Sequence, residues 1–170
     1  MEKDVIATVI ATLKDEGIDL VVTLPEEPTT PLVEEIRRDP YFTSITVAAE
    51  GHGISLCAGA SLGGRRCVFV TGTAGLLVGA WALAQMGVLY GIPLLILASY
   101  RGDLSDRSGI SGAQLFMFQQ VGEPLLKALR IPYRVLDRKS DLDRQIKDAH
   151  SACREYGTPV VLLLTGDVLW

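Results

Sequence analysis

The chain reads ITVAAEGHGISLCAGASLGGRRCVFVTGTAGL from residue 45 to residue 76. A short apolar strand at 45–49 runs into Glu50, and a helix rich in small residues follows. A second apolar strand begins at Cys67 and ends in a Gly-containing turn at 71–76. Open α/β sheets bind their ligands at the carboxyl ends of the strands, beside such turns. Glu50 is therefore a candidate functional residue rather than a surface charge.

The same alternation of apolar strands and helices extends over the whole chain. We expect strands at 19–24, 44–49, 67–71, 93–98, 133–136 and 159–164. We expect helices at 3–16, 31–38, 50–60, 74–90, 113–129 and 140–156. Gly122 and Pro124 predict a break in one helix, and the apolar helix at 74–90 is expected to be buried on most sides. The pattern predicts one α/β domain over residues 1–170, with a doubly wound, mostly parallel six-stranded sheet and helices on both faces.

The composition is apolar and acidic. Hydrophobic residues make up 48% of the chain, and the mean hydropathy is +0.29. Either a second chain covers much of the surface, or the α/β core is unusually tight. The net charge of −4 argues against a nucleic-acid-binding surface.

Cysteine use and the pattern of charges bear on the compartment. Three cysteines with no CxxC spacing predict buried reduced thiols and a cytoplasmic protein. The charged N-terminus does not resemble a signal peptide. Residues 67–100 carry no charge, but glycines and Pro93 interrupt them, so strand, helix and strand are expected rather than a membrane span.

Several common enzyme motifs are absent from the sequence. It contains no GxGxxG after the first strand, no GxxxxGK[ST] and no GxSxG. No cluster of histidine and cysteine suggests a metal site formed by this chain alone. Function must therefore be argued from Glu50 and the turn at 71–76.

The stretch at 49–66 resembles the pyrimidine-binding (PYR) domain of thiamine diphosphate enzymes, in which a glutamate followed by a Gly/Ala-rich helix precedes a strand and a Gly-containing turn. Within that family it is most similar to the alpha subunits of sulfopyruvate decarboxylase and to phosphonopyruvate decarboxylase. The resemblance covers nearly the whole chain. It is also carried by Gly17-Ile18-Asp19, Thr23-Leu24-Pro25, Gly91-Ile92-Pro93-Leu94-Leu95, Tyr100-Arg101-Gly102 and Ala113-Gln114.

The resemblance implies roles for residues of the site. Glu50 would bind the pyrimidine N1′ of the cofactor and favour the imino tautomer that removes the thiazolium C2 proton. The alternative is a carboxylate that only favours the helix dipole. His52 would serve as a proton donor, with a partly buried structural histidine as the alternative. The cofactor would also contact the turn at Thr73, Ala74, Gly75 and Leu76.

The resemblance also implies a substrate site, formed by Pro25, Thr71, Arg101 and Gln114. Arg101 would bind a sulfonate or phosphonate through its forked donors, and the alternative is a loop salt bridge with Asp103 or Asp106. The hydroxyls of Thr71 and Thr73 would face cofactor or substrate, or cap the next helix. Relatives carry Gln-Asn-Ser-Gly-Leu-Gly-Asn where this chain has GTAGLLV at 72–78. The chain thus lacks the two amide side chains that open that stretch, and it carries apolar residues near the helix start, which leaves the substrate open.

The companion (PP) domain of the family holds Mg²⁺ and the diphosphate through a Gly-Asp-Gly motif and a later asparagine. Gly166-Asp167 is followed by only three residues, so it cannot be that motif. The resemblance therefore implies a beta subunit that supplies the PP domain, an interfacial site and at least an α2β2 assembly. The expected activity is decarboxylation of a small 2-oxo acid, sulfopyruvate first and phosphonopyruvate second. A non-catalytic binding or regulatory subunit with the same fold is the rival hypothesis.

Overall fold

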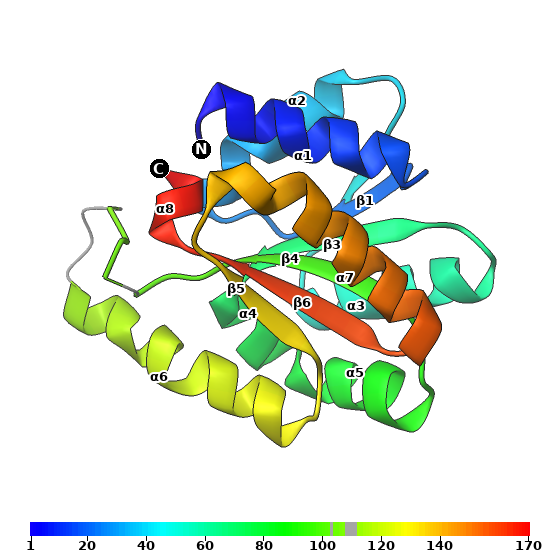
Figure 1. Cartoon of the computed structure of the whole chain (residues 1–170). Coiled ribbons are helices and arrows are strands. Elements are labelled where there is room, and N and C mark those ends of the chain that lie inside the picture. The colour runs from blue at the N-terminus through cyan, green and yellow to red at the C-terminus, as the bar shows by residue number, and fades with distance from the viewer. Residues whose placement is uncertain (103, 108–111) are drawn as a thin grey trace.

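The protein contains a six-stranded parallel sheet in the order β2-β1-β3-β4-β6-β5 (Figure 1). The computed structural model describes residues 1–102, 104–107 and 112–170, with the side chains of 112–114 left out. The strands are β1 (Leu20–Thr23), β2 (Thr43–Thr46), β3 (Cys67–Gly72), β4 (Leu94–Ser99), β5 (Tyr133–Leu136) and β6 (Pro159–Leu164). Within the described residues every strand pairing is parallel. The predicted fold class is confirmed.

Helices cover both faces of the sheet (Figure 1). One layer contains α1 (Lys3–Asp15), α2 (Thr30–Arg38) and α7 (Leu142–Tyr156). The other contains α3 (Glu50–Leu62), α4 (Thr73–Val78), α5 (Ala80–Leu83), η2 (Ala84–Leu89) and α6 (Gly112–Ala128). Short helices η1 (Glu27–Thr29), η3 (Lys139–Asp141) and α8 (Gly166–Leu169) complete the described chain.

The central strand β3 shows how the sequence divides the core. Val68 and Val70 pack into the cluster beneath α1, α2 and α7. Cys67 and Phe69 pack into the cluster on the opposite face. Successive side chains of a strand point to opposite faces, so a continuously apolar strand serves both layers, as buried parallel strands do.

The segment at 73–90 differs from the expected single helix. It divides into α4, α5 and the π-helix η2, with Gly79 between the first two. A Cβ on Gly79 would lie 2.5 Å from Cδ1 of Ile54, so Gly79 allows this segment to approach α3 closely. An apolar repeat reports which residues are apolar, but not where a helix changes its hydrogen-bonding pattern.

The expected burial of this segment on most sides is also wrong. Five of its apolar side chains are between 60 and 73% exposed, and together we call them the apolar face: Val78, Trp81, Val88, Leu89 and Tyr90. Only one side of the segment, including Leu76 and Leu83, reaches the core. The result is an exposed apolar surface of the kind that marks an interaction site.

Helix α6 continues where a break was predicted. Gly122 faces α4, and a Cβ there would lie 2.6 Å from Cγ2 of Thr73. The absence of a side chain at Gly122 therefore allows α6 to pack closely against α4. Pro124 leaves the carbonyl of Gln120 without its helical donor, but both residues are exposed, so that carbonyl faces water.

Two smaller expectations can be compared with the structure. The strand expected to end at Ala49 ends at Thr46, so residues 47–49 connect it to α3. The three cysteines are free and buried, as predicted. In the described part of the chain, every helix is too short or too polar to cross a bilayer.

Candidate functional site

Glu50 lies at the carboxyl edge of the sheet, as predicted. It is the first residue of α3, after the N-cap Ala49. A Cβ on Gly75 would lie 2.7 Å from Cγ of Glu50 and 3.2 Å from Oε1, and it would also clash with Oγ1 of Thr71. The glutamate therefore packs on the turn that follows β3. Only a glycine at position 75 leaves room for it.

The carboxylate of Glu50 remains available to a ligand. The side chain is half-buried. Among the described residues, none donates a hydrogen bond to its carboxylate or forms an ion pair with it. A half-buried carboxylate without a partner has unused acceptor capacity.

A second carboxylate, Glu26, occupies the same edge of the sheet. It lies in the loop after β1, and its Oε2 accepts a hydrogen bond of 2.5 Å from Oγ of Ser99, at the end of β4. Its carboxyl group also packs against Gly72, where a Cβ would have no room. Glu26 therefore ties the ends of β1, β3 and β4 together.

The environment of Glu26 favours its protonated form. Burial raises the pKa of this carboxyl above its usual value, and the nearby charge of Glu50 raises it further. The hydrogen bond from Ser99 and the charge of Arg101 act in the opposite direction but do not cancel the effect of burial. Glu26 thus retains its proton to a higher pH than an ordinary glutamate.

Sequence reasoning missed Glu26. Residues 25–31 were interpreted only as a loop, because three prolines break any regular pattern there. The signal was nevertheless present, since Glu26 follows an apolar strand as Glu50 does. The rule that ligands bind at the carboxyl ends of strands applies equally to both glutamates.

Arg101 lies just beyond β4 and is only 12% exposed. Its Nε is 3.6 Å from Oδ2 of Asp106, and its Nη2 is 3.8 Å from Oε2 of Glu27. The loop ion pair with Asp106 is therefore present, while Asp103 lies outside the described residues. Both nitrogens are buried without a hydrogen-bond partner among the described residues. Arg101 retains donors for an anionic ligand.

The threonines of the turn have different surroundings. Oγ1 of Thr73 donates a hydrogen bond of 2.8 Å to the carbonyl of Ser99, which fastens the start of α4 to β4. Thr73 does not cap α4, because the N-cap is Gly72 and no side chain caps the helix. Thr71 is buried with its hydroxyl beside Gly75.

Two other residues of the turn also lie in the first turn of α4. Ala74 is half-buried, whereas the side chain of Leu76 belongs to the core. Leu76 therefore has only its backbone to offer to a ligand.

The remaining predicted residues lie less close to Glu50. His52 is exposed, so the alternative of a partly buried structural histidine is wrong. It is two residues from Glu50 on α3, and residues at that spacing do not share a helix face. Pro25 is exposed beside Glu26. Gln114 is in the first turn of α6, where the side chains lie outside the described residues.

The family described as "Thiamine pyrophosphate enzyme, N-terminal TPP binding domain" matches residues 3–119. This span contains Glu26, Glu50, the turn after β3 and Arg101. The match therefore covers the residues that the fold brings to the carboxyl edge of the sheet.

Individual proteins extend the similarity. The chain is 32% identical over 150 residues to sulfopyruvate decarboxylase subunit alpha of Methanococcus maripaludis, over 88% of this chain and 87% of the relative. It is 31% identical to the same subunit of Methanothermobacter thermautotrophicus, over 79% of each chain. Identity to phosphonopyruvate decarboxylase of Streptomyces viridochromogenes is 25%, over 87% of this chain and 36% of the relative.

Proposed function

Because this chain belongs to the thiamine pyrophosphate enzyme family, we propose that it acts as the alpha, pyrimidine-binding subunit of a decarboxylase that converts sulfopyruvate to sulfoacetaldehyde and CO2. The observation that carries this proposal is the Glu50 carboxylate, which lies against Gly75 and has no partner among the described residues. The two alpha-subunit relatives at 31 and 32% identity support the choice of sulfopyruvate.

The residues at the carboxyl edge fit thiamine diphosphate. A Cβ at Gly72 or Gly75 would clash with the side chains of Glu26, Thr71 and Glu50, so the two glycines let both carboxyl groups lie against the turn. Glu50 has unused acceptor capacity there. When bound, thiamine diphosphate supplies the carbon nucleophile and the electron sink for loss of CO2. Glu50 would hold the pyrimidine ring by a hydrogen bond that its carboxylate accepts. The backbone of Thr73, Ala74, Gly75 and Leu76 would border the ring.

The chain's own residues would perform the remaining steps. Arg101 would bind the sulfonate of the substrate through its buried Nε and Nη2 donors, with Pro25, Thr71 and Gln114 nearby. Glu26, whose pKa is raised chiefly by burial, would carry a proton at its carboxyl group for the product. We propose His52 only as a second proton carrier, because it lies two residues along α3 from Glu50.

A second subunit would complete the site. Relatives of this chain are named as alpha subunits, and the apolar face here needs a cover. That face begins at Val78, on the same helix α4 whose first turn contains Thr73 and Gly75. We propose that a PP-domain beta subunit docks there and holds Mg²⁺ and the diphosphate, in at least an α2β2 assembly.

The rival function is a non-catalytic subunit with the same fold. The turn at 72–78 favours it, since Leu77 and Val78 stand where relatives carry Gly and Asn. Phosphonopyruvate is the alternative substrate, because Arg101 suits a phosphonate as well as a sulfonate.

The test is decarboxylation by the reconstituted complex. The chain is coexpressed with a PP-domain partner, Mg²⁺ and thiamine diphosphate are added, and CO2 release is followed from sulfopyruvate and phosphonopyruvate. We expect turnover that needs both chains and is faster with sulfopyruvate. A stable, cofactor-loaded complex that is inactive on both acids would keep the pyrimidine-binding role and refute both substrates. No complex and no activity would favour the rival function.

A further inference from the structure

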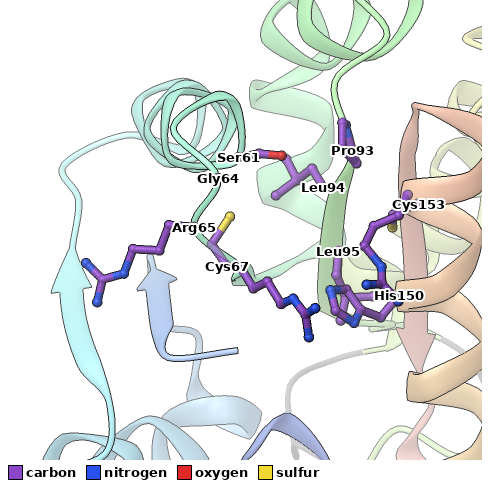
Figure 2. Close-up of a pocket in the computed structure, with 11 residues that line it drawn as sticks. Ser61, Gly64, Arg65, Cys67, Pro93, Leu94, Leu95, His150 and Cys153 are labelled. Carbon is purple, nitrogen blue, oxygen red and sulfur yellow. The ribbon is translucent and has the colours of Figure 1, made fainter. Parts of the chain in front are cut away.

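A separate cavity of about 270 Å³ opens at the amino edge of the sheet (Figure 2). Cys67 and Leu94, the first residues of β3 and β4, line it. The Glu50 site lies at the carboxyl ends of the same strands, so the two sites are on opposite edges. An occupant of this cavity would therefore be neither the cofactor nor the substrate of the proposed function.

Basic side chains border the cavity. Arg65, Arg66 and Arg154 line it together with His150, and none of its lining residues in the described chain is acidic. Arg65 is satisfied elsewhere, since it donates to both carboxylate oxygens of Asp19 and to Thr43, and Figure 2 shows it pointing away from His150. The positive charge that is not neutralised therefore comes from Arg66 and Arg154.

Arg66 and Arg154 have unused donors. Nη1 of Arg66 donates to the carbonyl of Glu16 at 2.7 Å, and among the described residues Arg66 forms no ion pair with a carboxylate. Arg154 has no side-chain hydrogen bond or ion pair in the described part of the chain. Both arginines are exposed at the rim of one cavity, and each can offer forked donors to an oxyanion.

His150 lies close to both arginines. It is 5% exposed, and its Nδ1 is 2.6 Å from Oε2 of Glu16. Burial is the main cause that lowers the pKa of His150, and the charges of Arg154 and Arg66 lower it further, against the raising effect of Glu16. The imidazole therefore senses the charge of both guanidinium groups, and an anion bound between them would act on it.

The inner wall of the cavity is apolar and contains Leu94 and Leu95 from β4 and Pro93, the residue before that strand. A volume near 270 Å³ is at the small end of ligand sites. The combination of two arginines with an apolar wall suits a small molecule that has one oxyanion and a short hydrocarbon portion.

We propose that the amino-edge cavity binds a small organic oxyanion, with the charged group between Arg66 and Arg154 and the hydrocarbon portion against Leu94. Such a site would allow a metabolite to act on the chain without entering the Glu50 site. The inference does not depend on the proposed decarboxylase function.

The two histidines of the chain provide a direct test. The imidazole NMR signals of the full-length chain are recorded during a titration with n-propyl phosphate, against sodium chloride at matched ionic strength. We expect a saturable shift of His150, with Kd in the roughly millimolar range or below, and a rise in the pKa of His150. His52, at the opposite edge of the sheet, should not respond.

Variants identify the donors. Arg154→Gln should weaken binding about tenfold or more, because a charge-assisted pair is lost, and Arg66→Gln should do the same from the other wall. Arg144→Gln is the matched control on the same helix, since Arg144 already pairs with Asp141. A titration without saturation, equal shifts at both histidines, or unchanged affinity in both Arg154→Gln and Arg66→Gln would overturn the proposal.

Discussion

Glu26 and Glu50 lie at the same carboxyl edge of the sheet but in different surroundings. Both are half-buried. Glu50 has no partner among the described residues, whereas Glu26 packs against Gly72 and accepts a hydrogen bond from Ser99. Two nearby carboxyl groups in different surroundings can hold different protonation states at one pH. This is the arrangement that a hydrogen-bonding base and a proton carrier require.

Glu26 should leave a signature in the pH dependence of stability. Its pKa is raised in the folded chain, chiefly by burial, so the native state binds this proton more tightly than the unfolded state. The unfolding free energy should therefore fall as the pH rises from the ordinary glutamate pKa through the raised one. Glu26→Gln should flatten this part of the profile, as measured by urea unfolding across that range.

The exposed Glu34→Gln variant, on α2, is the control for this measurement. It should leave the slope unchanged. A Glu26→Gln profile parallel to that of the wild type would show that the folded chain does not hold this proton.

For single residues, the sequence predicted where Glu50 lies but not which side chains lie beside it. The strand, glutamate and small-residue helix were recognisable as a local pattern. The contact of Glu26 with Ser99 joins residues 73 positions apart, and no local pattern carries that information. His52 appeared close to Glu50 in the sequence, but the helical turn separates the two side chains.

Among the elements, helix α3 shows how glycines with different surroundings act within one helix. A Cβ on Gly53 would meet the ring of Phe69 on β3, whereas a Cβ on Gly59 would meet nothing within 4 Å. Gly53 is therefore required for helix–sheet packing, and Gly59 is not.

This contrast predicts opposite effects of the same substitution. Gly53→Ala should destabilise the fold by about 1–3 kcal/mol through overpacking. Gly59→Ala should stabilise it by about 0.5–1 kcal/mol through helix propensity. Chemical denaturation of both variants measures the difference, and equal effects would mean that α3 does not pack on β3 through Gly53.

The strands were predicted well because their apolar runs are short and separated by glycine or proline. The division of 73–90 into α4, α5 and η2 was not predicted, because Gly79 breaks the segment through contact with Ile54 of α3. The exposure of Trp81 was also missed. In the sequence alone, an apolar residue that contacts a partner chain cannot be distinguished from one that packs in the core.

For the molecule as a whole, the exposed apolar face is the surface on which we propose that the beta subunit docks. Trp81→Ser should raise the Kd of the complex with the beta subunit by roughly 30-fold, or about 2 kcal/mol, as expected for an aromatic hot spot. The monomer should keep its stability, because Trp81 is 73% exposed. Isothermal titration calorimetry measures the change.

Tyr156→Ser provides the matched control, since Tyr156 is exposed on α7, in the opposite layer. It should leave the Kd unchanged. Equal losses in both variants, or none in Trp81→Ser, would place the partner on another surface.

The central claim is that Glu50 activates thiamine diphosphate. The most direct measurement is the rate at which the C2 proton of the bound cofactor exchanges for deuterium in the complex with the beta subunit. We predict that Glu50→Gln slows this exchange by about 10²-fold or more, while the cofactor remains bound. An unchanged exchange rate in a fully loaded Glu50→Gln complex would contradict the account.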